Sequence, residues 1–307
     1  MKCAHCGTDS DFRARAATGA CRVCGRRFVF EPRRDRNLTD LTFKLAIEGV
    51  SERGAYAWID DQLYYDLCRR VRRRRLFHRL IRRPTPSLSR DEFELLFARW
   101  IDVHGVPEGR LRGRQFERAE GDVPPNADAY GFERLVVCES DAIVDVLLAN
   151  GFHAEAKTPV LGFSGYPEHV HEALAPRLRE NPPALVVTVH DASWEGCALS
   201  AALTQSPRWF AGVELPQLID AGLRPADTRA YRGLYQRASS GRGSAEGVRP
   251  DEAEWLTRYR LDLAVARPRV LAGVLLRILR GETDRDGDGE AWPLVGGAWE
   301  DGDEEVG

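Results

Sequence analysis

Lysine, methionine and long apolar runs are all scarce in this chain of 307 residues. Lysine occurs only at Lys2, Lys44 and Lys157, so 41 of the 44 basic residues are arginine, which indicates an arginine-favouring genome as much as a binding function. No apolar run approaches the ~20 residues that a membrane-spanning helix needs. The chain also shows no basic region followed by an apolar stretch at its start, as a secretory signal would. We therefore expect a cytoplasmic protein with no membrane partner.

Two phosphate-binding motifs are missing as well. The sequence contains neither G-x-x-x-x-G-K-[ST] nor a G-x-G-x-x-G after a predicted strand, which disfavours NTP hydrolysis and dinucleotide chemistry. Hydrophobic residues at 43% and charged residues at 30% are values of globular proteins. The length suits roughly two domains of about 150 residues each, so we expect a folded protein with more than one unit.

Four of the seven cysteines form two C-x-x-C pairs, Cys3 with Cys6 and Cys21 with Cys24. The 14 residues between the pairs are typical of a four-thiolate tetrahedral zinc site. Each pair is followed by a glycine, which lets backbone amides turn toward the sulfurs. Residues 1–30 thus resemble a zinc ribbon, a module that binds nucleic acid, protein or only its own metal. Chance cysteines and an iron site are the alternatives, and we predict structural zinc.

Helical periodicity follows the ribbon. The predicted elements are a helix over 37–51, a short strand over 55–59, a helix over 60–76 and a helix over 91–100. Either Asp60 or Asp61 can cap the second helix, and Pro84 and Pro86 end it. This order over residues 37–104 resembles a winged-helix module, and the Gly-, Pro- and Arg-rich residues 105–130 are predicted to be a connector.

Apolar runs separated by helical stretches begin again near residue 131. The predicted elements are strands over 135–138 and 184–189 and helices over 141–150, 197–203, 215–221 and 251–280, with Gly151 as a left-handed cap. Buried strands alternating with helices favour an α/β fold with a mostly parallel sheet and flanking helices. We place this domain at 131–236, C-terminal helices at 248–281 and an acidic, disordered tail at 282–307.

Both predicted strands end in acidic residues. Glu139 follows the first strand in LVVCESDAIVDVLLANGF, and Asp191 follows the second in ALVVTVHDASWEGCALSAAL. These segments resemble the Toprim domain of bacterial primases, topoisomerases and several nucleases, in which a glutamate and a D-x-D pair followed by glycine share Mg²⁺. The resemblance implies Mg²⁺ at Glu139 and Asp191, with Gly196 as the family glycine, and cleavage or transfer of a phosphodiester. Such hard oxygen ligands suit Mg²⁺.

The sequence departs from the Toprim pattern at Ser193, which stands in place of the second aspartate. Ser193 is itself a candidate Mg²⁺ ligand beside Glu139 and Asp191, but its hydroxyl removes one negative charge and lowers the expected affinity for Mg²⁺. Asp141 or Glu195 would compensate, since both are near the two acidic anchors in the sequence. The alternative is that Glu139 and Asp191 only cap helices, in a catalytically inactive DNA-binding or assembly subunit that keeps the sheet as a scaffold.

Arginines crowd the helix predicted over 60–76. They are Arg69, Arg70, Arg72, Arg73, Arg74 and Arg75. A helix basic on several sides suits a phosphate backbone, and a solvated face or an acidic protein partner is the alternative. We predict a nucleic-acid partner, with DNA favoured over RNA; a protein partner or a homo-oligomer stays open.

A winged helix before a Toprim domain resembles the A subunit of topoisomerase VI, in which a tyrosine attacks DNA. The resemblance implies Tyr64 or Tyr65 as the nucleophile, with Tyr65 as the candidate, although Asp61 and Gln62 stand where the family has an arginine. Adjacent aromatic residues on an amphipathic helix are usually part of a core, and we favour that interpretation.

Overall fold

The structure is a computed structural model, and it describes residues 1–33, 35, 37–73, 84–116, 133–167, 176–238 and 246–282. Of Ala14, Arg72 and Arg73 it describes the backbone alone. The chain forms two compact units, Met1–Leu111 and Arg112–Gly307. None of the described helices is long and apolar enough to cross a membrane. The acidic tail predicted from residue 282 lies, beyond Glu282 itself, outside the described residues.

The first unit consists of two cysteine-containing turns followed by helices. The helices are α1 (Phe12–Thr18), α2 (Asp40–Val50), α3 (Asp60–Arg73) and α4 (Arg90–His104). A hydroxyl cap at Thr39 begins α2, and a capping box of Ser89 and Glu92 begins α4. The ring of Phe43 in α2 packs on that of Trp100 in α4, with centroids 4.9 Å apart. The three helices predicted in this region are confirmed as far as the structure describes them.

The short strand predicted over 55–59 is wrong. The backbone turns through residues 51–56, and Trp58 forms a single parallel bridge with Arg110. Trp58 N donates to Gly109 O and Leu111 N donates to Trp58 O, both at 2.8 Å. Residues 105–111, predicted as connector, therefore pair with the helical module. Within the described residues of this unit, backbone pairing is limited to such isolated bridges.

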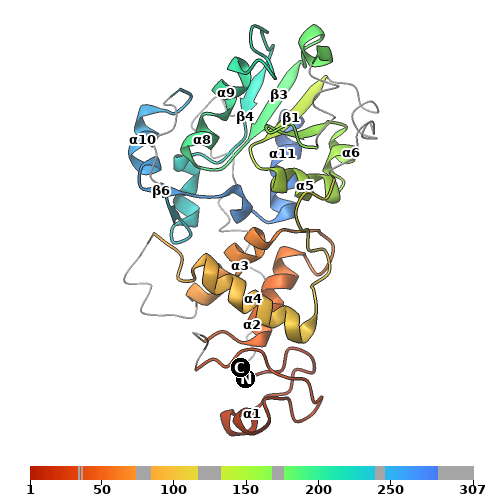
Figure 1. The fold of residues 1–307 in the computed structure, drawn as a ribbon, viewed down its shortest axis with the longest axis vertical. Coiled ribbons are helices and arrows are strands. Elements are labelled where there is room, and N and C mark those ends of the chain that lie inside the picture. Colours follow the sequence, from red (N-terminus) through yellow and green to blue (C-terminus); the bar gives the residue numbers. More distant parts are fainter. Residues whose placement is uncertain are drawn as a thin grey trace. The chain divides into compact units, whose positions relative to one another are not determined.

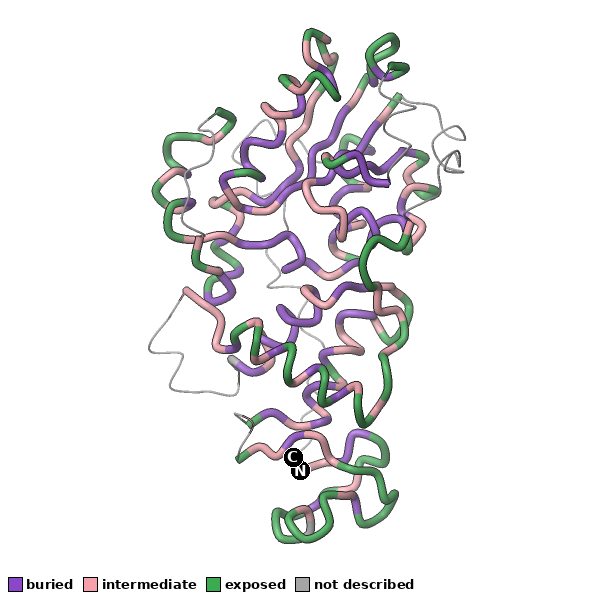
Figure 2. The backbone as a smooth tube through the Cα atoms, in the orientation of Figure 1, coloured by how far each residue is buried: buried purple, intermediate pink, exposed green. Residues whose placement is uncertain are grey.

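Four parallel strands form the sheet of the second unit, in the order β2-β1-β3-β4 (Figure 1). The strands are β1 (Arg134–Cys138), β2 (Val160–Gly162), β3 (Leu185–Val189) and β4 (Leu218–Asp220). The central pair, β1 and β3, is in register from Arg134↔Leu185 to Cys138↔Val189. Each of these two strands is buried after its first residue (Figure 2), as expected for parallel strands covered on both faces. The predicted α/β class with a parallel sheet is confirmed.

Helices flank the sheet (Figure 1). They are α5 (Asp141–Ala149), α6 (Phe152–Ala156), α8 (Trp194–Cys197), α9 (Leu199–Gln205), α10 (Pro250–Leu256), α11 (Pro268–Leu279) and the 3₁₀ helices η2 (Pro225–Tyr231) and η3 (Leu263–Val265). Leu135 and Val137 of β1 and Val186 of β3 share one buried cluster with Leu203 of α9 and Trp209. Between α5 and α6, Gly151 has φ of 70°, which confirms its predicted left-handed conformation.

The helix predicted over 215–221 is wrong, because residues 218–220 form β4. The helix-like spacing of Leu215, Leu218 and Ile219 suggested an amphipathic helix. In the folded chain, however, this segment pairs with β3, with Val187 opposite Ile219. Strand formation therefore depends on what the tertiary fold places beside a segment. No local pattern predicted β2, which has only three residues.

The C-terminal helices belong to the same compact unit as the sheet. Between α10 and α11 the chain forms β6 (Tyr259–Arg260), which pairs with β5 (Gln236–Arg237), and then η3. We call residues 259–265 the C-terminal strap. Ala192, just after β3, pairs with Leu261 of the strap through both backbone hydrogen bonds, at 2.9 and 3.1 Å. The strap therefore runs beside the end of β3.

Candidate metal centres

The four predicted cysteines converge in the first unit. The Sγ atoms of Cys3 and Cys24 are 3.7 Å apart, those of Cys6 and Cys21 are 3.6 Å apart, and all four lie within 4.8 Å of one another. A tetrahedron of thiolates about 2.3 Å from a zinc ion has edges of about 3.8 Å. Among the described residues, no other group of three or more His, Cys, Asp or Glu donors is this close. The cysteine cluster can therefore hold a metal such as zinc.

The two turns of the cluster share one backbone design. Gly7 and Gly25 have φ of 71° and 70°, a left-handed conformation that glycine adopts without strain. Gly7 N donates to Cys3 O at 3.0 Å, and Gly25 N donates to Cys21 O at 2.9 Å. The glycine after each pair thus closes the turn that brings its two sulfurs together.

Within the cluster the thiol pKa values move in both directions: the hydrogen bond with Arg26 lowers the pKa of Cys24, but desolvation and the neighbouring cysteines raise it to about 11. Hydrogen bonds with Thr8 lower the pKa of Cys6 to about 6, which favours the thiolate that binds metal. Burial raises the pKa of Cys68 and of Cys197 to about 12, and that of Cys138 further. These three thiols stay protonated at neutral pH and behave as small apolar residues.

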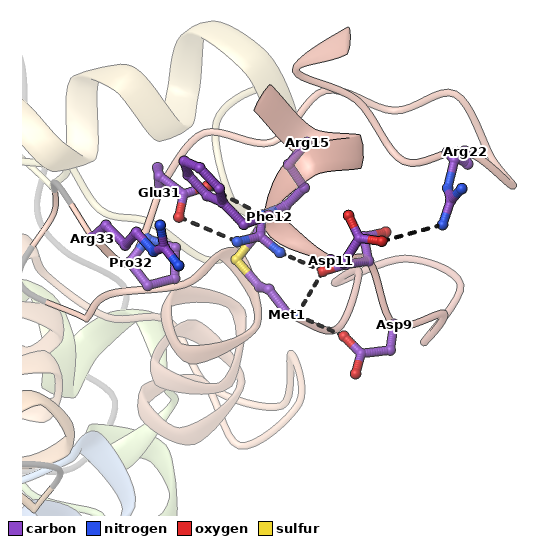
Figure 3. A pocket seen from close by; sticks show the side chains of 10 residues that line it. Met1, Asp9, Asp11, Phe12, Arg15, Arg22, Glu31, Pro32 and Arg33 are labelled. Atoms are coloured by element: carbon purple, nitrogen blue, oxygen red, sulfur yellow. Dashed lines mark hydrogen bonds and ion pairs between the residues drawn. The ribbon is translucent and has the colours of Figure 1, made fainter. Parts of the chain in front are cut away.

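The second cysteine turn is exposed and basic. Arg22, Arg26 and Arg27 are all exposed, and Val23 between them is 68% exposed. A groove of about 530 Å³ lies beside this turn (Figure 3). Its charges are largely compensated: Arg15 pairs with Glu31 at 3.1 Å, and the terminal ammonium and Arg22 also face carboxylates. The exposed Arg26 and Arg27 lie on the turn and are not among the residues that line the groove.

Glu139 and Asp191 lie side by side at the carboxyl edge of the sheet. Glu139 directly follows β1 and Asp191 follows β3 two residues after its end, and these strands are parallel neighbours. The Asp191 amide donates to Glu139 Oε2 at 2.9 Å, and the Glu139 amide donates to Val189 O at 2.8 Å. We call Glu139 and Asp191, 52 positions apart in the chain, the carboxylate pair; the contact between them joins the Asp191 backbone amide to the Glu139 carboxylate. This edge is where ligands of parallel sheets collect.

Both carboxyl groups resist ionisation. Burial raises the pKa of Glu139, and burial followed by the charges of Glu139 and Asp262 raises the pKa of Asp191 well above its usual value. Asp262, in the strap, is buried and has no sequence signal that connects it with this site. A bound cation would relieve the repulsion among these groups, so the electrostatics suit a cation site.

Ser193 caps a helix rather than replacing a carboxylate. Its Oγ accepts from Gly196 N at 2.9 Å at the start of α8, and it lies 3.5 Å from Glu139 Oε1. Gly196 has no space for a side chain, because a Cβ there would collide with the Asp191 carbonyl oxygen and lie 2.7 Å from Glu139 Oε2. The glycine of the predicted motif is therefore required by the packing of the carboxylate pair.

Of the two residues expected to compensate for Ser193, Asp141 is engaged elsewhere. Its carboxylate pairs with Arg114 at 2.9 Å and accepts from Ser164 Oγ at 2.7 Å. Glu195 is exposed, and its charge contributes to raising the pKa of Glu139. Of these two residues, Glu195 is therefore the one whose negative charge acts on Glu139.

The predicted arginine surface lies partly outside the described residues. Arg70 forms a 2.7 Å ion pair with the buried Asp66, and Arg69 is half-buried. The side chains of Arg72 and Arg73 and the whole of Arg74 and Arg75 are outside the described residues.

The two tyrosines of α3 are core residues. Tyr65 is fully buried and Tyr64 is 2% exposed. The Tyr64 hydroxyl donates to Leu88 O at 2.9 Å. Their burial supports the core interpretation over a nucleophilic role, which needs an accessible hydroxyl.

Comparisons of the chain with protein-family models, with curated proteins and with solved structures gave no match. What each centre can do therefore follows from its own residues, and four close thiolates suit a metal such as zinc.

Proposed function

We propose that this protein acts on nucleic acid through a Toprim-like sheet that holds one Mg²⁺ ion at Glu139 and Asp191 and supports phosphodiester cleavage or transfer. The observation that carries the proposal is the 2.9 Å hydrogen bond from Asp191 N to Glu139 Oε2, which joins the ends of two adjacent parallel strands. The same proposal assigns zinc to the cysteine cluster and a winged-helix-like role to α2, α3 and α4, an order similar to that of the topoisomerase VI A subunit.

Two carboxylates are enough for such a site, because Mg²⁺ keeps several of its waters when it binds to proteins. When bound, the ion supplies positive charge to a phosphoryl group and acidifies a water molecule. In hydrolysis the water oxygen bonds to phosphorus, the bond from phosphorus to one sugar oxygen breaks, and that oxygen takes up a proton. The residues of this chain hold the ion at the sheet edge; the proposal assigns no chemistry to Tyr65.

The test of this chemistry is Mg²⁺- or Mn²⁺-dependent nicking of plasmid DNA. We expect Glu139→Gln and Asp191→Asn to abolish nicking, because each removes one of the two charges that hold the ion. Glu254→Gln is the matched control, since Glu254 is an exposed carboxylate of the same unit whose side chain is 77% exposed. Equal nicking by all three variants would exclude the carboxylate pair as the site.

The exposed basic turn supports a nucleic-acid partner. Each phosphate that a protein neutralises on duplex DNA contributes about 0.9 to the slope of log K against log salt. We expect joint replacement of Arg22, Arg26 and Arg27 by alanine to make this slope shallower. Arg258→Ala removes an exposed arginine of the other unit and should leave the slope unchanged. Binding that does not depend on salt would indicate a protein partner instead.

A second candidate function is that of an inactive nucleic-acid-binding or assembly subunit. The observation that favours it is the use of Ser193 as a helix cap, where the Toprim pattern places a second carboxylate. This candidate predicts salt-dependent DNA binding without nicking and without any effect of Glu139→Gln.

A further inference from the structure

The strap contacts the carboxylate pair directly. Leu263 N donates to Asp191 Oδ1 at 2.6 Å, so the strap holds one oxygen of this carboxylate. Leu263 is the first residue of η3, where a backbone N–H has no partner within the helix. Asp191 therefore supplies this amide with an acceptor, in the way that a capping side chain does.

The strap is itself held in place at two points. Leu261 pairs with Ala192, the residue after Asp191, in both directions. The Asp262 carboxylate accepts from Gln236 Nε2 at 2.7 Å and pairs with Arg260 at 3.2 Å. Because the two residues that precede Leu263 are fixed, the direction of the hydrogen bond from its amide to Asp191 is fixed as well.

We propose that the C-terminal strap is part of the cation site, with the Leu263 amide as the group that positions the Asp191 carboxylate for the ion. This inference rests on the proposed function. Partners that orient a metal ligand from behind are a general feature of metal sites, and removing one typically weakens metal binding about 10- to 100-fold.

A proline at position 263 removes the amide proton and changes little else in the backbone. Proline is tolerated at the first position of a helix, and the residue before it prefers an extended conformation. Asp262 already has that conformation, with φ of −71° and ψ of 142°. Leu263→Ala is the matched control, because it also removes the buried leucine side chain but keeps the N–H.

The experiment measures Mn²⁺ binding to the zinc-loaded full chain by electron paramagnetic resonance. The Asp191→Asn variant measures how much Mn²⁺ binds outside the proposed site. We expect Leu263→Ala to bind within about twofold of the unchanged protein and Leu263→Pro to bind ~10-fold or more weakly. The melting temperatures of these two variants in EDTA should be similar, which separates a positioning effect from a loss of stability.

The Mn²⁺ affinities distinguish the strap proposal from the proposed cation site on which it rests. Equal Mn²⁺ affinity of Leu263→Pro and Leu263→Ala would overturn the strap proposal and leave the cation site standing. Binding to the unchanged protein that is no stronger than to Asp191→Asn would overturn the cation site, and the strap proposal with it. If Leu263→Pro does not fold, a Mg²⁺ titration of ¹⁵N-leucine-labelled protein replaces it: the Leu263 amide signal should shift, and a static signal during Mg²⁺ binding would overturn the strap proposal.

Discussion

In the first unit, each cysteine turn places its two sulfurs three positions apart in the chain, whereas in the second unit Glu139 and Asp191 are 52 positions apart. The cysteine turns form from local hydrogen bonds, such as Gly25 N to Cys21 O at 2.9 Å. The carboxylate pair forms only after β1 and β3 have paired. A metal bound by four thiolates would thus hold the first centre together, while the whole sheet holds the second.

The largest expected effect, and the strongest test of this difference between the two units, is the removal of a zinc ligand. We expect Cys21→Ser to lose the metal and to unfold residues 1–30, because structural zinc contributes about 10–16 kcal/mol to folding in small zinc modules. The sheet of the second unit should remain folded. Zinc content and hydrogen exchange of both units measure the result, and Cys68→Ala, outside the cluster, should keep one zinc per chain. Retention of zinc by Cys21→Ser would contradict the four-thiolate site.

A smaller effect is expected where the second centre depends on close packing. Gly196→Ala places a Cβ against the Asp191 carbonyl and Glu139, and overpacking of this kind costs about 1–3 kcal/mol. Gly273→Ala in α11 is the matched control, since a Cβ there meets nothing within 4 Å and should stabilise the helix by about 0.5–1 kcal/mol. Urea unfolding measures both. Equal effects of the two substitutions would show that the packing around Gly196 is loose.

The smallest predicted effect concerns pH and the metal-free protein. Because burial raises the pKa of Asp191 in the folded state, the folded protein binds the proton more tightly than the unfolded chain. The contribution of Asp191 to stability is then highest at low pH and falls as pH rises through the folded-state pKa. Asparagine does not ionise, so Asp191→Asn should melt at a higher temperature than the unchanged protein near pH 8 and at a similar temperature near pH 4.

Two controls accompany this measurement of melting temperature. Asp251→Asn, at an exposed position, is the matched control for replacing a carboxylate by an amide. Saturating Mg²⁺ should stabilise the unchanged protein and not Asp191→Asn, since a ligand that binds only the folded state stabilises it. If saturating Mg²⁺ leaves the difference in melting temperature between Asp191→Asn and the unchanged protein as it was, the result would argue against ion binding at Asp191.

Two strands of the second unit were predictable because the sequence pattern that indicates each of them lies within a single segment. The apolar runs of β1 and β3 and the acidic residues that follow them could be located from the sequence. The strand β4 was predicted as a helix, because the spacing of Leu215, Leu218 and Ile219 says nothing about the edge of β3 with which the segment pairs. The role of Ser193 as a cap also required the position of α8.

By itself, the sequence determined the cysteine turns, since ligands, spacing and the glycines that close each turn all lie within a few residues. It also determined that acidic residues end two buried strands. Only the tertiary structure decided that the Glu139 carboxylate accepts from the Asp191 amide, that Asp141 is held by Arg114 instead, and that the Leu263 amide reaches Asp191. The physical reason is that local hydrogen bonds are encoded by neighbouring residues, whereas strand pairing joins distant segments whose partners no single segment specifies.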